Sequence, residues 1–404
     1  MAQLWTSLLL IISSVPIVSS AMSLPVLYVE GTHYEVAREI GTTFKERILE
    51  FYRLNEDLKA VLIPFVATKR GKQIYTDYVK TVNATYPQYL DEMRGISDAT
   101  GIPFLHVFVS HMAAEIEAFM ALEPLDDCSD VHIVNSHLTM IAHNEDTNPL
   151  IKDRGYVISA KIKNVNPRGL LTVAEERFTA YSYPGYLQGN TFAFTGTGLV
   201  LTANALYPKY PKTGRKIPRY VLNRAILSAQ NIVDLERILK NVNYGCAFGF
   251  SVNAADFSKL PVTATYNYEV APSDEAKSIV SKITIRPERA RASRSTNIGY
   301  YYHFNMYDHY QIEQNPKSIT SSQHRKARAF RLPVPRSDDD ARVILGDTLD
   351  RKYPIYRTPR PTDPGCTVAT GEFDLTNCKL SIYKSNPKTT KIPLVQIEIP
   401  CNNT

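Results

Sequence analysis

Residues 127–146 read DCSDVHIVNSHLTMIAHNED, and the character of the chain changes within this stretch. Val131–Val134 and Leu138–Ala142 are short apolar runs, and Asn135-Ser136 between them is typical of a turn. The stretch therefore predicts a strand, a tight turn and a second strand. Cys128 stands at the start of the first strand.

The residues before this stretch have a helical pattern, and those after it are rich in strands. Helical spacing of apolar residues is found over residues 33–66, 72–93 and 105–122. Strand-like runs are found at 156–162, 169–173, 191–194, 199–203, 247–252, 262–270, 278–285, 366–373, 379–383 and 394–399. Helices are predicted again at 219–239 and 319–330. This order predicts an α+β fold in which helices cover sheets.

Composition and charge exclude some classes of partner. Of the 404 residues, 44% are hydrophobic and 21% are charged, which is typical of a globular protein with a sizeable core. The net charge is +6, and no run of Lys and Arg resembles a block that binds phosphate backbones. We therefore expect no nucleic-acid partner. No nucleotide-binding loop is found either, and no cofactor is expected.

The N-terminus has the pattern of a secretory signal. Residues 4–18 are largely apolar but too few to span a bilayer comfortably, and Ser19-Ser20-Ala21 fits a small-residue cleavage site. We expect residues 1–21 to be a signal peptide and the mature chain to be secreted or lysosomal. No later segment is long and apolar enough to cross a membrane. Asn83 and Asn402 begin glycosylation sequons that this route would use.

The chain contains five cysteines, an odd number for an oxidising compartment. No pair of them has metal-ligand spacing, so no zinc site is expected. If Cys128 is a nucleophile, the other four could form up to two disulfides: Cys246, Cys366, Cys378 and Cys401. The sequence leaves their pairing open.

A cysteine that begins a strand behind a helical region has one distinctive chemical use. If the bond before Cys128 is cut, this residue acquires a free α-amine beside its thiol. That amine has an ordinary pKa of about 7.7–8.0, so it can act as general base for its own side chain. The alternative is a buried, inert cysteine.

Several motifs resemble, in order, those of one enzyme family. They are HYEVAREIG (33–41), YPQYLDEMRGI (86–96), DCS (127–129), HNED (143–146), GLVLTANAL (198–206), PRYVLNR (218–224), YEV (268–270) and HFN (303–305). The family is that of acyl-coenzyme A:isopenicillin N acyltransferase. LGD (345–347), YPIYR (353–357) and TVAT (367–370) are similar to its animal branch, which hydrolyses β-alanyl amides of biogenic amines.

The resemblance implies a fold and a set of roles. The fold is a four-layer αββα sandwich of the N-terminal nucleophile hydrolase type. Cutting between Asp127 and Cys128 would give a helical α chain, residues 22–127, and a catalytic β chain, residues 128–404, held together as a heterodimer. Cys128 would be the nucleophile, Asp146 would assist it, and Asn305 would donate to the oxyanion.

The same motifs assign supporting positions and a substrate class. Asn144, Asn204, Arg224 and Glu269 occupy places of substrate or structural support. The substrate implied is a small N-acyl amide, such as a β-alanyl amide of a biogenic amine, which passes its acyl group through a thioester to water or to another amine.

The chain departs from the family at two points. Asp127 stands where the family has Gly, whose conformational freedom favours the acyl shift that cuts the chain. The family's functional Arg near the segment 365–367 has no aligned counterpart here, since Arg360 is only nearby.

Two other readings stay open. One is a papain-like hydrolase with His303, His309 or His324 as the base. The other is a secreted binding or structural protein that has kept the fold without processing or catalysis.

Overall fold

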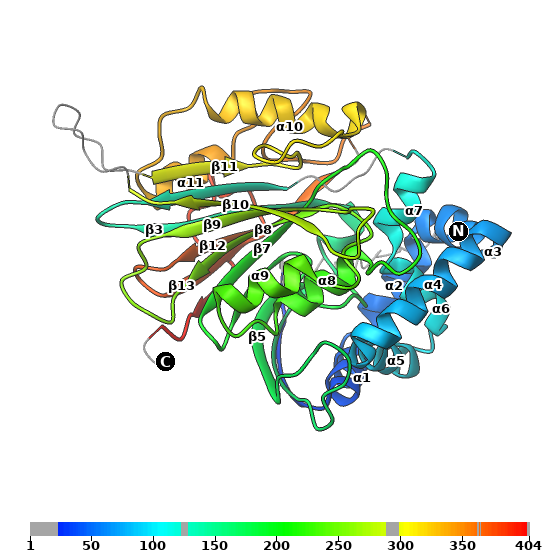
Figure 1. The fold of residues 1–404 in the computed structure, drawn as a ribbon. Helices are drawn as coiled ribbons and strands as arrows, with labels where there is room; N and C mark the ends of the chain where they lie inside the picture. The colour runs from blue at the N-terminus through cyan, green and yellow to red at the C-terminus, as the bar shows by residue number, and fades with distance from the viewer. Residues whose placement is uncertain (1–22, 123–127, 288–298, 362, 364, 402–404) are drawn as a thin grey trace, which may run out of the picture.

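The computed structural model describes residues 23–122, 128–287, 299–361, 363 and 365–401 (Figure 1). The predicted signal peptide, Asp127 and Asn402 lie outside the described residues. Asn83 is exposed on a helix. Among the described helices, none combines the length and apolar character needed to span a bilayer.

The segment before Cys128 is mostly helical, as predicted, and its helices gather on one side of the molecule (Figure 1). Its elements are β1 (Val26–Gly31), α1 (His33–Thr43), α2 (Lys45–Leu54), the π-helical turn η1 (Leu58–Leu62), α3 (Ile63–Ala67), α4 (Lys69–Thr85), α5 (Pro87–Thr100), α6 (Phe104–Ser110) and α7 (Ala113–Phe119). The strand β1 was not predicted. It pairs in parallel with a strand of the main sheet, so this segment contributes to the core.

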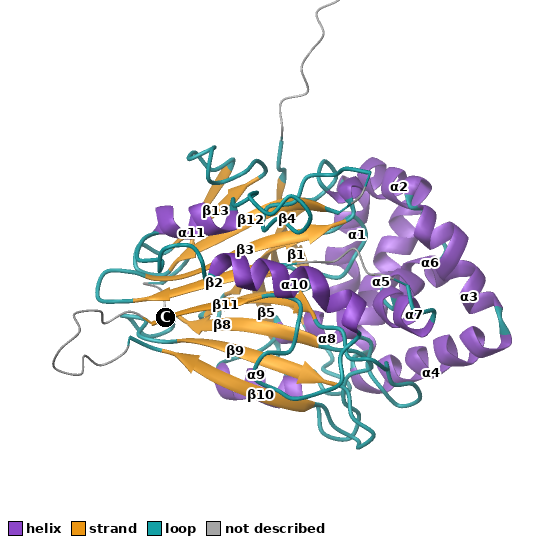
Figure 2. Ribbon diagram, turned by 90° about the horizontal axis from the view of Figure 1, so that it is seen from above, coloured by secondary structure: helices purple, strands orange, loops and turns teal. Residues whose placement is uncertain are grey.

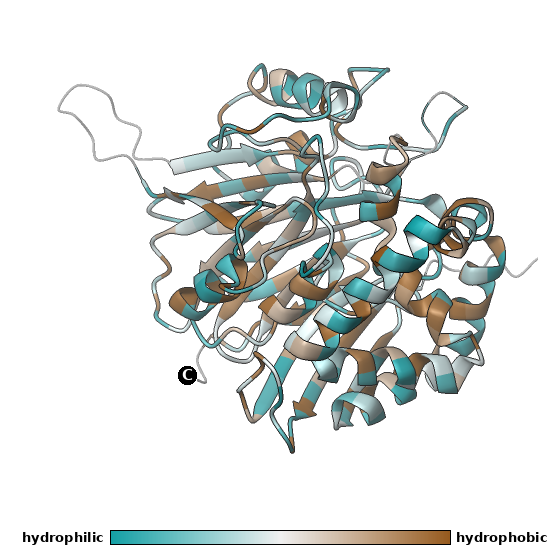
Figure 3. Cartoon of the chain, turned by 45° about the vertical axis from the view of Figure 1, so that its right-hand side comes forward, coloured by the Kyte–Doolittle hydropathy of each residue, from teal (hydrophilic) through white to brown (hydrophobic). Residues whose placement is uncertain are grey.

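Local signals explain where these helices begin and how closely they pack. Thr32 and Glu35 form a capping box at the start of α1. Pro87 opens α5, and Gly101 ends it with a φ of 81°. The helices α1 and α5 approach so closely that a Cβ atom on Gly95 would lie 2.6 Å from the carbonyl oxygen of Tyr34. Hydrophilic and hydrophobic residues alternate around these helices (Figure 3).

The remainder of the chain forms two sheets and the helices that cover them. The larger sheet has the strand order β1-β4-β5-β6-β7-β8-β9-β10 and is antiparallel except for β1 and β4. Its further strands are β4 (Tyr156–Lys163), β5 (Glu175–Ser182), β6 (Phe192–Thr195), β7 (Leu199–Ala205), β8 (Phe250–Asp256), β9 (Thr265–Ala271) and β10 (Ile279–Ile285).

The smaller sheet is antiparallel and has the order β11-β2-β3-β12-β13-β14. Its strands are β2 (Ser129–Val134), β3 (Thr139–Thr147), β11 (Gly299–His303), β12 (Cys366–Asp374), β13 (Lys379–Tyr383) and β14 (Val395–Glu398). The predicted strand, turn and strand after Cys128 are confirmed as β2 and β3. A 3₁₀ turn, η2 (Pro149–Ile151), follows β3.

The two sheets lie face to face, and helices cover their outer faces (Figures 1 and 2). Between the sheets, Phe192 of β6 meets Phe373 of β12 with ring centroids 6.2 Å apart. The helices α10 (Pro316–Ala329) and α11 (Asp338–Leu345) pack on the smaller sheet in a separate apolar cluster. The helices α8 (Arg219–Ile226) and α9 (Ile232–Lys240) lie on the larger sheet. The α+β class is confirmed.

Some predicted elements differ from the structure. Residues 169–173 form turns and loop rather than a strand, and Gly169 has a φ of 66°. The predicted helix 219–239 is two helices, because Asn231 caps a new one. The strands β5 and β11 and the helix α11 were not predicted.

The cysteine pairing is partly settled. Cys378 and Cys401 form a disulfide, with Cα atoms 5.9 Å apart. Cys128, Cys246 and Cys366 are buried and free. The chain therefore has one disulfide among its described residues, where the sequence allowed up to two.

A buried ion cluster joins the N-terminal helices to the larger sheet. Arg224 of α8 donates to Glu92 of α5 at 2.7 Å and to Glu176 of β5 at 2.6 Å. His33 of α1 contacts both carboxylates, at 2.7 and 3.3 Å. Arg224 and Glu176 have no exposed side-chain surface, so each charge depends on its partners.

We expect Arg224→Met to lower the free energy of unfolding by about 3–5 kcal/mol, because it leaves two buried carboxylates without their cation. The measurement is urea denaturation followed by circular dichroism. Arg237→Met on α9 is the matched control. Arg237 is largely exposed, and its ion pair with Asp234 should contribute less than about 1 kcal/mol. Equal losses in the two variants would contradict the structural role of Arg224.

A second prediction concerns His111, whose burial lowers its pKa to about 4. Its Nε2 accepts from the Leu187 amide at 2.8 Å, and its Nδ1 contacts the Val107 carbonyl at 2.7 Å. In the unfolded chain His111 has a pKa near 6.5, so as the pH falls it takes up its proton at a higher pH than in the folded chain. Stability should therefore be full above pH 6.5 and fall by about 3 kcal/mol as the pH drops toward 4. His111→Gln should flatten this fall in a series of thermal melts, and an unchanged pH slope would contradict the prediction.

Candidate active site

Cys128 lies directly before β2, and the pairing of β2 with β3 brings the polar side chains of His143 and Glu145 beside it. In that register Ser129 faces Asn144, and Asp130 faces His143. Because side chains alternate along a strand, His143 and Glu145 share one face of β3. The Cys128 Sγ lies 3.9 Å from Glu145 Oε1, and its side chain is buried.

A chain of hydrogen bonds continues from Glu145 into the space between the sheets. Glu145 Oε2 lies 3.0 Å from His143 Nε2, and His143 Nδ1 lies 2.9 Å from Asp130 Oδ1. The Tyr183 hydroxyl donates to Glu145 Oε1. The Thr202 hydroxyl donates to Asp130 Oδ1 at 2.7 Å. Thr202 belongs to β7 of the larger sheet and Tyr183 directly follows β5, so both sheets contribute to the site.

These contacts set the protonation of the thiol and the imidazole. The pKa of the Cys128 thiol is raised to about 12, mainly by burial and secondly by the Glu145 carboxylate, while His143 opposes the rise. Burial by itself would lower the pKa of His143, but the Asp130 carboxylate and the bond to Glu145 raise it well above its ordinary value. The thiol is therefore protonated at neutral pH and needs a base at hand before it can attack.

Asn305 contacts the main chain of the nucleophile. Its Oδ1 accepts from the Cys128 nitrogen at 2.5 Å and from Arg325 Nη2 at 3.0 Å, while its Nδ2 donates to the Ala205 carbonyl at 3.0 Å. The partners of Oδ1 are donors and that of Nδ2 is an acceptor, which fixes the orientation of the amide. Asn305 thus reaches Cys128 through its oxygen, and its predicted role as the donor to the oxyanion stays a prediction.

Arg325 is a residue of the site that sequence reasoning missed. Its Nη1 donates to the Cys128 carbonyl at 2.5 Å and to Ser129 Oγ at 2.9 Å. It is fully buried on α10, on the face that also carries Ser318, Ser322 and Ala329. An arginine on the buried stripe of an amphipathic helix was the available signal. Arg360 instead donates to the Lys352 carbonyl of a nearby loop.

Asp146 and Asn144 lie on the other face of β3. The Thr367 hydroxyl donates to Asp146 Oδ1 at 2.5 Å. The charge of Asp146 raises the pKa of Cys128, but less than that of Glu145 does. Asn144 donates to the Leu345 carbonyl at 2.8 Å and accepts from Thr370 at 2.7 Å, which makes it a structural bridge. The carboxylate that contacts the thiol is that of Glu145, and assistance by Asp146 stays a prediction.

The remaining support positions divide into two kinds. Arg224 is structural, as described above. Glu269 is structural too, since its carboxylate accepts from the amides of Asp308 and Tyr310 at 2.6 and 2.8 Å and so holds the loop after Asn305. Asn204 is different: its side chain is buried, and neither of its polar atoms has a hydrogen-bond partner among the described residues.

The histidine beside the thiol is not one of the three considered for a papain-like site. His303 bonds to Ser251 and Glu269, His309 to Ser281 and Asn267, and His324 to Asp350. The structure brings His143 to Cys128 instead, with Asp130 and Glu145 on its two nitrogens.

A cavity of about 520 Å³ borders the site. Its wall includes Tyr183, which donates to Glu145, and Thr147 at the end of β3. Aromatic side chains of Phe51, Tyr186 and Tyr220 line it, and the acidic Asp57 and Glu117 lie at it as well. Such a chamber has the size and lining of a small-molecule site.

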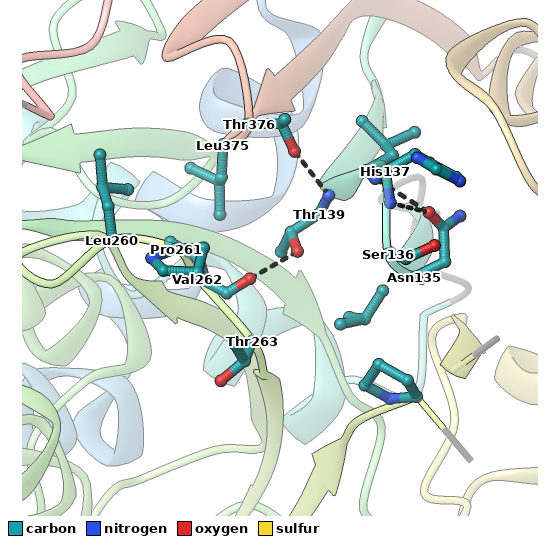
Figure 4. Close-up of a pocket in the computed structure, with 13 residues that line it drawn as sticks. Asn135, Ser136, His137, Thr139, Leu260, Pro261, Val262, Thr263, Leu375 and Thr376 are labelled. Carbon is teal, nitrogen blue, oxygen red and sulfur yellow. Dashed lines mark hydrogen bonds between the residues drawn. The ribbon is translucent and has the colours of Figure 1, made fainter. Parts of the chain in front are cut away.

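A second cavity, of about 620 Å³, lies at the far end of the β2–β3 hairpin (Figure 4). There Thr139 donates to the Val262 carbonyl at 2.6 Å, and its amide donates to Thr376 at 3.0 Å. The strand β2 has six residues, which places this cavity roughly 20 Å from Cys128. It is therefore separate from the thiol site, although it is larger.

Residues 134–389 match the model of the family described as acyl-coenzyme A:6-aminopenicillanic acid acyl-transferase. The chain belongs to this acyl-transferase family. It is also 30% identical over 387 residues to the beta-alanyl-dopamine/carcinine hydrolase of Drosophila melanogaster, an alignment that covers 94% of this chain and 97% of the fly protein. The family predicted from the motifs is confirmed, with its insect-like branch. Membership of this acyl-transferase family makes the chain an enzyme of the amide hydrolase or acyltransferase class.

We expect Arg325→Lys to reduce amide turnover by about 10–100-fold. Lysine keeps the charge but cannot hold the Cys128 carbonyl, Ser129 and Asn305 together, and a small displacement of a nucleophile costs rate of this order. Initial rates on a β-alanyl amide measure the effect. Arg331→Lys, an exposed residue just beyond α10, is the control. Equal rates in both variants would exclude a positioning role for Arg325.

Proposed function

We propose that this chain is a cysteine N-terminal nucleophile enzyme that cuts itself before Cys128 and then hydrolyses small N-acyl amides through a thioester. One observation carries the proposal: the nitrogen and the thiol of Cys128, the two groups that an N-terminal cysteine would use, lie in the same buried cluster. The Cys128 nitrogen is held by Asn305 at 2.5 Å, and the thiol lies 3.9 Å from Glu145. Two facing sheets between helical layers are consistent with the αββα sandwich of this enzyme type.

In the self-cleavage step, the thiol attacks the carbonyl carbon of Asp127 and its proton passes to Glu145. A carbon–sulfur bond forms, the carbon–nitrogen bond breaks, and the Cys128 nitrogen takes up a proton to become an amine. Water then hydrolyses the thioester and leaves the Asp127 carboxylate and a free thiol. Arg325 holds the Cys128 carbonyl throughout, so the nucleophile stays in place when the chain is cut.

In the catalytic step, the α-amine of Cys128 takes the proton of its own thiol, and the sulfur attacks the substrate amide. The proton then passes to the leaving amine, and the acyl group remains on sulfur. Water, deprotonated by the same α-amine, releases the acid. Asn305 would orient the amine through Oδ1, and its Nδ2 would reach the oxyanion after turning away from Ala205. The free amide of Asn204 supports a second contact to substrate.

The proposed substrates are β-alanyl amides of aromatic amines. The fly relative is named for beta-alanyl-dopamine and carcinine, whose amine parts each carry an aromatic ring. The 520 Å³ cavity supports this class, because its aromatic wall suits a ring and Asp57 suits the ammonium group of a β-alanyl end. Residues 22–127 and 128–404 would remain together as α and β chains, since β1 and the Arg224 cluster bind the first to the second.

We further propose that the protein acts in a secretory compartment or a lysosome. The Cys378–Cys401 disulfide supports an oxidising environment. The exposed position of Asn83 supports its use as a glycosylation site. Asp127 favours the competing reading, a binding protein that is never cut, because it replaces the glycine of the family.

The test is expression of the full chain through a secretory pathway, with N-terminal sequencing of every band on a denaturing gel. We expect a band that begins at Cys128 and turnover of β-alanyl-dopamine, and we expect Cys128→Ala to lose both. Cys246→Ala removes another buried thiol and should retain both. An uncut wild-type chain would favour the binding protein, and turnover by Cys128→Ala would exclude this nucleophile.

A further inference from the structure

The thiol site also contains a set of metal ligands. The Cys128 sulfur, a ring nitrogen of His143 and a carboxylate oxygen of Glu145 lie within 4.8 Å of one another, and all three side chains are buried. Thiolate, imidazole and carboxylate are the groups that bind zinc in proteins. We propose that the mature chain binds one zinc-class divalent cation here and that the cation blocks the nucleophile. The block and the fourth ligand rest on the proposed function, whereas the set of three side-chain ligands does not.

The separations of the donor atoms suit such an ion. A tetrahedral zinc with ordinary bond lengths keeps sulfur, nitrogen and oxygen ligands about 3.4–3.6 Å apart. Here His143 Nε2 lies 3.0 Å from Glu145 Oε2, and the Cys128 Sγ lies 3.9 Å from Glu145 Oε1. The two distances end on different oxygens of Glu145, and one donor atom from each of the three residues lies within 4.8 Å of the other two, so side-chain movements would complete the site.

A second layer of hydrogen bonds already orients two of the ligands. Asp130 Oδ1 lies 2.9 Å from His143 Nδ1, so that Nδ1 carries a proton and Nε2 faces the thiol. The Tyr183 hydroxyl donates to Glu145. A carboxylate behind a ligating histidine is the usual support of protein zinc sites. The carboxylates around the site also favour a cation, because those of Asp130 and Glu145 flank His143 and that of Asp146 acts on the thiol.

Cleavage would add a fourth ligand. In the uncut chain the Cys128 nitrogen is an amide, whose lone pair is delocalised and does not bind zinc. Once free, the amine and the thiolate of one residue form a five-membered chelate ring. Binding releases the thiol proton and the Nε2 proton of His143 to solvent, and no electrons are transferred. Tyr183, which contacts Glu145, lines the 520 Å³ cavity, so the ion would enter from that side. The mature protein should therefore bind the ion more tightly than the uncut chain.

Spacing along the chain does not reveal this set, which is why the sequence predicted no zinc site. His143 and Glu145 are two residues apart on one strand, and Cys128 comes from the neighbouring strand. Pairing of β2 with β3 brings the three together, whereas zinc motifs read from sequence depend on short loops between paired ligands.

The experiment is titration of the chelator-treated mature protein with cobalt(II) chloride. We expect one cobalt per chain, with a thiolate-to-metal charge-transfer band in the near ultraviolet that zinc chloride abolishes by displacement. Cys128→Ser should lose the band, and Asp130→Asn should weaken binding by about 10–100-fold. His324→Ala removes a partly exposed histidine elsewhere and should leave binding unchanged. A band that persists in Cys128→Ser would assign the metal to another thiol and overturn the proposal.

A second measurement needs no variant at the site. Zinc should protect Cys128 of the wild-type protein from alkylation by iodoacetamide, as read by peptide mass spectrometry, and should inhibit turnover at the concentration that displaces cobalt. Alkylation and turnover that zinc leaves unchanged would overturn the proposal. A cobalt band without any amide turnover would overturn the proposed function alone. Turnover without a band would overturn the metal site alone.

Discussion

The buried group formed by Asp130, His143 and Glu145 is the constraint on which the active-site geometry depends. Burying two carboxylates is costly unless each is paired and hydrogen-bonded. The imidazole between them supplies the pairing, at 2.9 and 3.0 Å. Further bonds come from Thr202 in the opposite sheet and from Tyr183, which directly follows β5 of that sheet. A shift of one sheet over the other would break these bonds. The group therefore fixes how the two sheets lie on each other, and Cys128 lies at its edge.

The outer layers fix the nucleophile from the other side. Arg325 reaches from α10 to the Cys128 carbonyl and to Asn305, which in turn binds the Cys128 nitrogen. The main chain at Cys128 is thus held at both its nitrogen and its carbonyl by side chains far along the sequence. This arrangement explains how the start of a strand keeps its position whether or not the peptide bond before it is intact. The position of Cys128 therefore depends on α10 more than on the residues that precede Cys128.

The sequence predicted those parts of the fold that are specified locally. The strands β2 and β3 contain short apolar runs on either side of an Asn-Ser turn, and α1 begins with a capping box, so both could be predicted from neighbouring residues. The strand β1 could not, because a parallel edge strand is defined by its pairing with β4, more than a hundred residues later in the chain. The strand β5 begins with charged residues, Glu175 to Arg177, that mask its strand character.

The candidate site also has parts that short motifs predict and parts that depend on contacts between distant residues. Cys128 and Asn305 were predicted from short motifs, and the structure brings them into contact. Arg325 contacts Cys128 across 197 residues of sequence, and no local pattern encodes such a contact. Glu145 and Asp146 are adjacent in one motif, yet the alternation of strand side chains places them on opposite faces. The motif locates the segment, but the alternation of side chains along β3 decides which of its two carboxylates contacts the thiol.

The electrostatics of the site argue for the α-amine as the working base. A carboxylate next to a buried thiol opposes its ionisation, and the pKa of about 12 for Cys128 shows that His143 does not compensate. His143 itself is held protonated by two carboxylates, so it has no lone pair to offer as a base while the metal-free group is intact. Asp130 cannot reach the thiol except through that ring. A neutral amine on the same residue has an ordinary pKa near 8, lies next to the sulfur by covalent geometry, and appears only when the chain is cut. Among the described residues of the uncut chain, only Glu145 is placed to take the thiol proton, and the proposed cut would add the α-amine as the base of the catalytic step.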